Sequence, residues 1–185
     1  MAQCHPPFPM KYYVAILFHR PDALDAAKWE ITAVWGDLDY EGADHLFDVT
    51  EYYAPEMGSP LFRRMVSFAA LMPPTALVEM KLRCNAIEDA LAVGGKRIVN
   101  LDAGYLDHNK IILASAKEAG QKIYLDRGIY ADFVGRYQRG NYQPFDWTFP
   151  DFRDGRYDQE LLTMRKIYLG QMREWRNASP KDATP

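Results

Sequence analysis

Carboxylate, amide and amine side chains gather in the stretch from Arg97 to Phe133 (RIVNLDAGYLDHNKIILASAKEAGQKIYLDRGIYADF). Asn100 and Asp102 are two residues apart at the predicted end of a strand, so both side chains lie on one face of it. A carboxylate in such a place can act as a general base or as a ligand for a divalent cation. The alternative is structural: Asp102 can close an Asx-turn onto the backbone of its own loop.

Two lysines flank the next apolar run, KIILAS. Lys110 opens the run, and Lys117 follows it in the triplet Ser115-Ala116-Lys117. A lysine beyond the end of a strand can bind a phosphate or a carboxylate, or it can simply lie in solvent. We therefore regard both lysines as candidate anion contacts.

A third polar group lies in EYYAPEMGSPLFR. Tyr53 and Glu56 precede Ser59-Pro60, a pair typical of the first residues of a helix. The amino terminus of a helix offers free N–H groups to an anion, and Arg63 adds positive charge in the predicted first turn. The competing interpretation is ordinary helix capping beside a surface arginine.

Several function classes lack their motifs. The triplet SAK also occurs in the guanine-recognition loop of GTPases, but the chain has no GxxxxGK[ST] loop and no NKxD. The four histidines lie in four separate segments without the spacing of a zinc site. A GxSxG nucleophile motif is missing as well. The sequence identifies neither a metal nor a cofactor.

Length and composition indicate one domain of ordinary globular type. The chain has 185 residues, of which 48% are hydrophobic and 25% charged. A net charge of −3 does not indicate nucleic-acid binding over the whole surface. Without an apolar run of roughly 20 residues or a secretory signal, no membrane contact is expected and the cytoplasm is the predicted location. The two cysteines do not form a disulfide framework.

Hydrophobic spacing and turn residues predict the order of helices and strands. Predicted strands are 11–18, 43–53, 97–101, 110–114 and 122–125, the last resuming at 129–135. Predicted helices begin at Asp22, at Ser59-Pro60, at Thr75 and at Asp158, the last one ending near Trp175. Gly104 is predicted to form a turn with a positive φ.

Short connections in the centre of the chain favour antiparallel neighbours over crossover units. The fold class predicted is α+β: a single domain with a mainly antiparallel sheet of five or six strands and helices packed chiefly on one face. Residues 10–175 form the expected core, between an irregular segment at 1–10 and a polar tail at 177–185.

Five motifs, taken in order, resemble the DUF4416 family of uncharacterised bacterial and archaeal proteins over roughly residues 10–175: EYYAPEMGSPLFR, NLDAGYL, KIILASAK, IYLDRGIYADF and WTFPDFR. The family pattern reads Asn-Leu-Asp-Pro-Gly-Tyr where this chain has Ala103. The resemblance brings no activity with it, because the family name denotes unknown function. Some similar proteins are labelled GTP-binding, a label that the missing phosphate loop leaves unsupported here.

Two functional hypotheses remain. The first is a site for an anionic small molecule or nucleotide, with or without catalysis, formed where EYYAPEMG, NLDAGYL and LASAK meet. Its catalytic candidates are Asp102 and Glu56, as general base or metal ligands, and its binding candidates are Asn100, Lys110, Lys117, Tyr53, Tyr105 and Arg63. The second is a non-catalytic interaction or assembly module that uses the aromatic WTFPDF loop. A shared pocket favours the first hypothesis, and a flat aromatic patch favours the second. The sequence does not indicate an oligomeric state.

Overall fold

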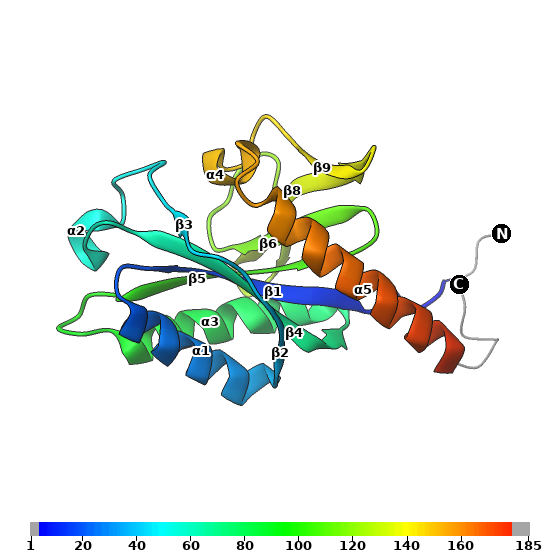
Figure 1. The fold of residues 1–185 in the computed structure, drawn as a ribbon, viewed down its shortest axis with the longest axis horizontal. Helices are drawn as coiled ribbons and strands as arrows, with labels where there is room; N and C mark the ends of the chain where they lie inside the picture. The colour runs from blue at the N-terminus through cyan, green and yellow to red at the C-terminus, as the bar shows by residue number, and fades with distance from the viewer. Residues whose placement is uncertain (1–3, 179–185) are drawn as a thin grey trace.

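The computed structural model describes residues 4–178, and within them nine strands form one sheet (Figure 1). Every strand pair is antiparallel, and the order across the sheet is β2-β4-β1-β5-β6-β8-β7, with β3 beside β4 and β9 beside β8. The strands are β1 Met10–Phe18, β2 Leu38–Glu41, β3 His45–Leu46, β4 Phe62–Met72, β5 Val99–Leu106, β6 Lys110–Ser115, β7 Ile123–Asp126, β8 Ile129–Gln138 and β9 Asn141–Pro144.

The helices lie on both faces of the sheet. They are α1 Pro21–Trp35, α2 Ala54–Met57, a short 3₁₀ helix Pro74–Ala76, α3 Leu77–Leu91, α4 Pro150–Arg153 and α5 Asp158–Ala178. Figure 1 shows α1 and α3 on one side and α5 across the other. The α+β class and the antiparallel sheet are confirmed, although the sheet has nine strands instead of five or six.

Strand β1 is buried along its whole length because helices cover both of its faces. Tyr12 and Val14 pack with α1 and α3, whereas Tyr13 and Ala15 pack with α5. This double burial explains why the strand reads as a continuous apolar run. The predicted strand 11–18 is therefore the centre of both cores.

The helix predicted from Ser59-Pro60 is wrong, because the segment forms strand β4. Its apolar residues fit helical spacing, but the segment pairs with β1 on one side and with β2 on the other. Met65 and Val66 are both fully buried, one on each face, which a single-sided surface helix does not permit. Pairing within the sheet thus overrides the local pattern.

The strand predicted over 43–53 is also largely wrong. Only His45–Leu46 is a strand there, and the chain runs on as a loop into α2. The predicted polar tail falls mostly on residues 179–185, which lie outside the described residues, as do residues 1–3 of the irregular first segment. Helix α5 begins at Asp158, as predicted, and runs to Ala178.

Gly104 does not form a turn with positive φ; it lies inside β5. A Cβ at this position would stand 2.5 Å from the backbone oxygen of Ile112 and 2.8 Å from the Tyr13 ring. Glycine is needed here because neighbouring groups approach too closely for any side chain. The same strand assignment removes the Asx-turn proposed for Asp102.

Candidate functional site

A cavity of about 590 Å³ opens where β5 and β6 separate. Their pairing covers Gly104↔Leu113 to Leu106↔Ile111 and goes no further, so the first half of β5 lacks a neighbour on that side. Loop 47–53, the end of β6 and helix α4 complete the wall. Its aromatic lining consists of Phe47, Tyr52, Tyr53, Phe149 and Phe152. Its charged lining consists of Arg63, Lys81, Glu88, Arg97, Asp102, Lys117, Lys122, Asp132 and Asp151.

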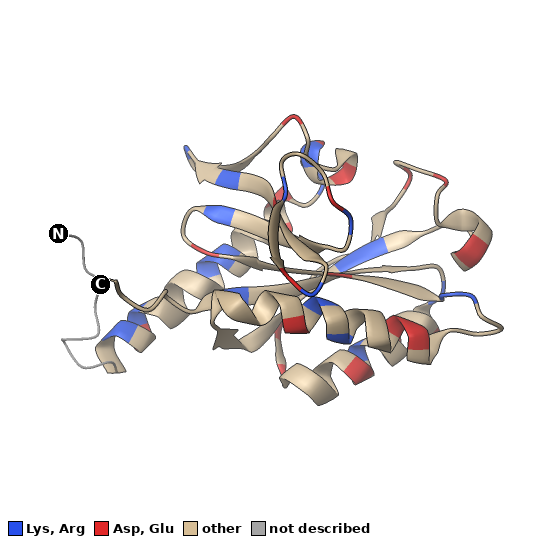
Figure 2. Ribbon diagram, turned by 180° about the vertical axis from the view of Figure 1, so that it is seen from behind, with Lys and Arg blue, Asp and Glu red and all other residues tan. Residues whose placement is uncertain are grey.

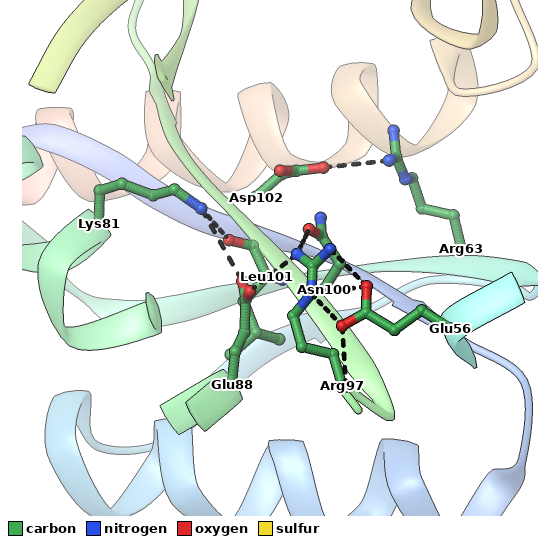
Figure 3. Close-up of polar contacts among 8 residues, drawn as sticks. All are labelled: Glu56, Arg63, Lys81, Glu88, Arg97, Asn100, Leu101 and Asp102. Carbon is green, nitrogen blue, oxygen red and sulfur yellow. Dashed lines mark hydrogen bonds and ion pairs between the residues drawn. The ribbon is translucent and has the colours of Figure 1, made fainter. Parts of the chain in front are cut away.

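Side chains of helix α3 supply the hydrogen-bond partners that a neighbouring strand would have given to the backbone of β5 (Figure 3). Lys81 Nζ donates to the backbone oxygen of Leu101 (2.9 Å), and the Leu101 amide donates to Glu88 Oε1 (2.7 Å). Both side chains therefore reach from the α1/α3 face into the gap between β5 and β6. Burial raises the pKa of Glu88, while the nearby Lys81 ammonium opposes that rise.

Arg97 ties three elements together beside the cavity (Figure 3). Its guanidinium donates to Glu56 Oε2 (2.7 Å), to Asn100 Oδ1 (3.1 Å) and to Glu88 Oε2 (3.4 Å). The hydrogen bonds from Arg97 lower the pKa of Glu56, which stays an ionised partner at neutral pH. Glu56 thus holds Arg97 in place and does not itself line the cavity.

Arg63 is a buried cation between two carboxylates. Its Nη2 donates to Asp102 Oδ2 (3.0 Å), and its Nη1 donates to Asp151 Oδ2. Its guanidinium carbon also lies 4.7 Å from the centre of the Phe47 ring. Arg63 was expected near a helix terminus but lies in β4, so it joins the sheet to α4 across the cavity.

The opposite wall carries a lysine and serine group. Ser115 Oγ accepts hydrogen bonds from Lys122 Nζ (2.8 Å) and from the Lys117 amide (3.1 Å). Lys122 Nζ also lies 3.5 Å from Asp132 Oδ2. Burial raises the pKa of Asp132, and its interaction with Lys122 opposes that rise. The Lys117 ammonium lies 5.0 Å from the centre of the Tyr52 ring.

Five residues singled out from the sequence line this one cavity: Tyr53, Arg63, Asn100, Asp102 and Lys117. Lys110 does not, because β6 begins there whereas the cavity lies at the end of that strand; it pairs with Asp107 instead. Tyr105 points to the opposite face of β5 from Asp102, where its ring lies 5.5 Å from that of Tyr12. Glu56 and Asp102 do not form a shared metal or base site, since each is bound by a different arginine.

Sequence reasoning missed Lys81, Glu88, Arg97, Lys122, Asp132 and Asp151 in the lining. One signal was present in α3: Lys81, Cys84 and Glu88 follow helical spacing, so two charges share the buried face with a cysteine. Buried charges of this kind need partners and therefore indicate a polar gap in the core.

Charges of both signs mix in the protein as in the cavity. Figure 2 shows acidic and basic residues interspersed along the helices in that view.

Over residues 4–178, no group of three or more His, Cys, Asp or Glu side chains is placed to hold a metal ion. The same part of the chain contains no helix with the length and hydropathy to cross a membrane.

Comparison with known proteins gives one result. A family model described as "Domain of unknown function (DUF4416)" matches residues 8–168. Searches of curated proteins and of solved structures found no match.

Proposed function

The chain belongs to the DUF4416 family, and from its cavity we propose that it binds an anionic small molecule. The observation that carries this proposal is the state of Lys117. Five cations of the described residues line the cavity, and four of them form an ion pair with a carboxylate. Lys117 is the fifth, and within residues 4–178 it forms none. Lys117 is exposed at the mouth of the cavity, so its charge is free to bind a ligand anion.

The other cations of the wall are already neutralised. Arg63 pairs with Asp102 and Asp151, Lys81 with Glu88, Arg97 with Glu56 and Glu88, and Lys122 with Asp132. These pairs hold the wall rigid at little net charge. A single added anion therefore has one preferred place, next to Lys117.

The size and lining of the cavity suit a metabolite. Its volume of about 590 Å³ falls within the roughly 300–1,000 Å³ of typical small-molecule sites. Tyr52 and Phe149 lie at the wall and are largely exposed, so a planar or sugar ring can pack against them. A nucleotide or another phosphorylated metabolite combines such a ring with an anion.

A thermal-shift screen of nucleotides, phosphorylated metabolites and dicarboxylates tests the proposal. For a compound that raises the melting temperature, we expect Lys117→Gln to weaken binding about 10-fold or more, because a charge-assisted contact contributes about 1.5–3 kcal/mol. Lys110→Gln is the matched control, since Lys110 flanks the same strand at the end remote from the cavity. Equal affinity in the two variants, or no anion that binds, contradicts the proposal.

The competing function is a docking module that uses the WTFPDF loop. Trp147 and Phe149 are each 46% exposed, and Trp147 stacks on Phe145 at 4.7 Å. Phe149 lines the cavity, however, while Trp147 does not. If the loop serves the cavity, Phe149→Ala weakens ligand binding and Trp147→Ala leaves it unchanged. If Trp147→Ala weakens ligand binding more than Phe149→Ala does, or if both weaken it equally, the loop does not serve the cavity through Phe149 and the docking function is favoured.

A further inference from the structure

Three buried polar atoms on the cavity wall have no hydrogen-bond partner among the described residues: Asn100 Nδ2, Arg63 Nε and Asp132 Oδ1. The three residues are only 5%, 4% and 3% exposed. Arg63 is already held between Asp102 and Asp151, so Asn100 and Asp132 indicate what the ligand carries at each end. Both line the cavity. Buried polar groups are nearly always hydrogen-bonded in folded proteins, so an unpaired pair on one wall suggests that a ligand completes them.

The neighbours of each atom define its role. Arg97 Nη1 donates to Asn100 Oδ1 (3.1 Å), which fixes the amide and leaves Nδ2 as a free donor. Lys122 Nζ lies 3.5 Å from Asp132 Oδ2 and opposes the rise that burial causes in the pKa of Asp132; Oδ1 is left as the unpaired acceptor. The ligand therefore needs an acceptor at Asn100 and a donor at Asp132.

Strand register gives the separation of the two ends. Asp132 pairs with Leu113, and Leu113 pairs with Gly104, which lies four residues beyond Asn100 on β5. With about 4.8 Å between strands and about 3.4 Å per residue, the two α-carbons are roughly 16 Å apart. Both side chains project from the same face of the sheet, so only a hydrogen bond of about 3 Å at each end shortens this distance, which leaves roughly 10 Å for the ligand. Inorganic phosphate is too small to touch both.

The anion belongs at the Asn100 end. Because β5 and β6 are antiparallel, the chain beyond Ser115 runs toward the Asn100 end of β5, and it carries Lys117 there. Asp132 lies further along, beside Lys122. The Asp132 carboxylate already has Lys122 as its counter-charge, so a neutral hydroxyl, which adds no second positive charge, is the better donor.

We propose that the ligand is a phosphorylated sugar, free or as part of a nucleotide, with its phosphate at Lys117 and Asn100 and a sugar hydroxyl donating to Asp132. This inference rests on the proposed function, which gives the anionic group of the ligand, and adds the sugar that carries it.

Calorimetric titration of the wild-type chain tests the inference without any mutation. The probes are ribose 5-phosphate and n-butyl phosphate, which share a phosphate but differ in hydroxyl groups. We expect ribose 5-phosphate to bind about 10-fold tighter or more, the factor given by one hydrogen bond to a carboxylate. Equal affinities overturn the sugar inference and leave the anion site standing, whereas no binding of either phosphate overturns both.

A variant and a second ligand pair extend the test. Asp132→Leu combined with Lys122→Met removes the acceptor together with its ion-pair partner, so that no unpaired charge is left in the cavity. The double variant should reduce ribose 5-phosphate binding to the level of n-butyl phosphate. Unchanged ribose 5-phosphate binding in that variant overturns the inference. Adenosine 5′-monophosphate, compared with ribose 5-phosphate, distinguishes the source of the sugar phosphate. Tighter binding of adenosine 5′-monophosphate supports a nucleotide, and tighter binding of ribose 5-phosphate supports a free sugar phosphate. The 2′,3′-dideoxy analogue of adenosine 5′-monophosphate tests the sugar hydroxyls. Identical binding of the adenosine compound and its dideoxy analogue also counts against a sugar hydroxyl at Asp132.

Discussion

Replacing Arg63 by methionine tests the ion-pair network that holds the cavity wall together. Arg63 is 5% exposed at its side chain and neutralises Asp102 and Asp151, of which Asp151 is only 2% exposed. Removing one partner of a buried ion pair costs about 3–5 kcal/mol, because a charge is left without compensation. The Tyr157 hydroxyl still donates to Asp151 (3.1 Å) and offsets part of this cost. We expect a loss of about 3 kcal/mol in the free energy of unfolding.

The neighbouring Arg64 provides the matched control. It lies on the same strand and pairs with Glu41 and Asp44; Arg64 is half-buried and its two partners are 34% and 41% exposed, so water screens both pairs. Exposed ion pairs contribute about 0–1 kcal/mol, so Arg64→Met should cost little. Urea denaturation of both variants and the parent measures the difference.

A double variant identifies the cause of the loss. Adding Asp151→Asn to Arg63→Met removes the uncompensated charge, so the pair should be more stable than Arg63→Met alone by at least about 1 kcal/mol. If Arg63→Met and Arg64→Met cost the same within about 1 kcal/mol, Arg63 does not hold the wall and this reasoning fails.

Three further predictions use stability or reactivity. Gly104→Ala should destabilise the fold by about 1–3 kcal/mol through overpacking, while Gly170→Ala, with open space in α5, should be neutral or stabilising; chemical denaturation that ranks them the other way contradicts the close approach at Gly104. Burial raises the pKa of Cys84 to about 12, so a thiol reagent should label only Cys4 in the native protein and both cysteines after unfolding; two fast native thiols would contradict this burial. The pKa of Glu56 is lowered on folding by its hydrogen bonds with Arg97, so its contribution is present above about pH 5 and is lost as the pH falls through the folded pKa. Glu56→Gln should therefore flatten the acid limb of the stability curve, and an unchanged limb would show that the carboxylate contributes nothing.

Local sequence patterns predict the elements that carry one clear period. Strand β1 is a continuous apolar run, and α3 and α5 keep their apolar residues at helical spacing. Strand β4 is mispredicted as a helix because Met65, Phe68 and Met72 fit helical spacing by coincidence. Only its pairing with β1 and β2, which are distant in sequence, decides its form.

The cavity is predictable only in part for the same physical reason. Strand-end reasoning selects Lys117, which follows β6 and lines the cavity; it also selects Asn100 and Asp102, which line the cavity from the first half of β5 and not from its end. It cannot find Lys81 or Glu88, because their access depends on β5 and β6 separating. That separation is a property of the whole sheet and leaves no mark in the local pattern.

Amide chemical-shift mapping tests the central claim most directly. The chain, labelled with nitrogen-15, is titrated with ribose 5-phosphate, adenosine 5′-monophosphate and inorganic phosphate. We expect saturable shifts in loop 47–53, at 115–117 and at 149–152 with at least one probe, and a midpoint at about 10-fold higher ligand concentration or more in Lys117→Gln. Saturable shifts confined to other surfaces, or no shifts with any probe, would contradict an anion site in this cavity.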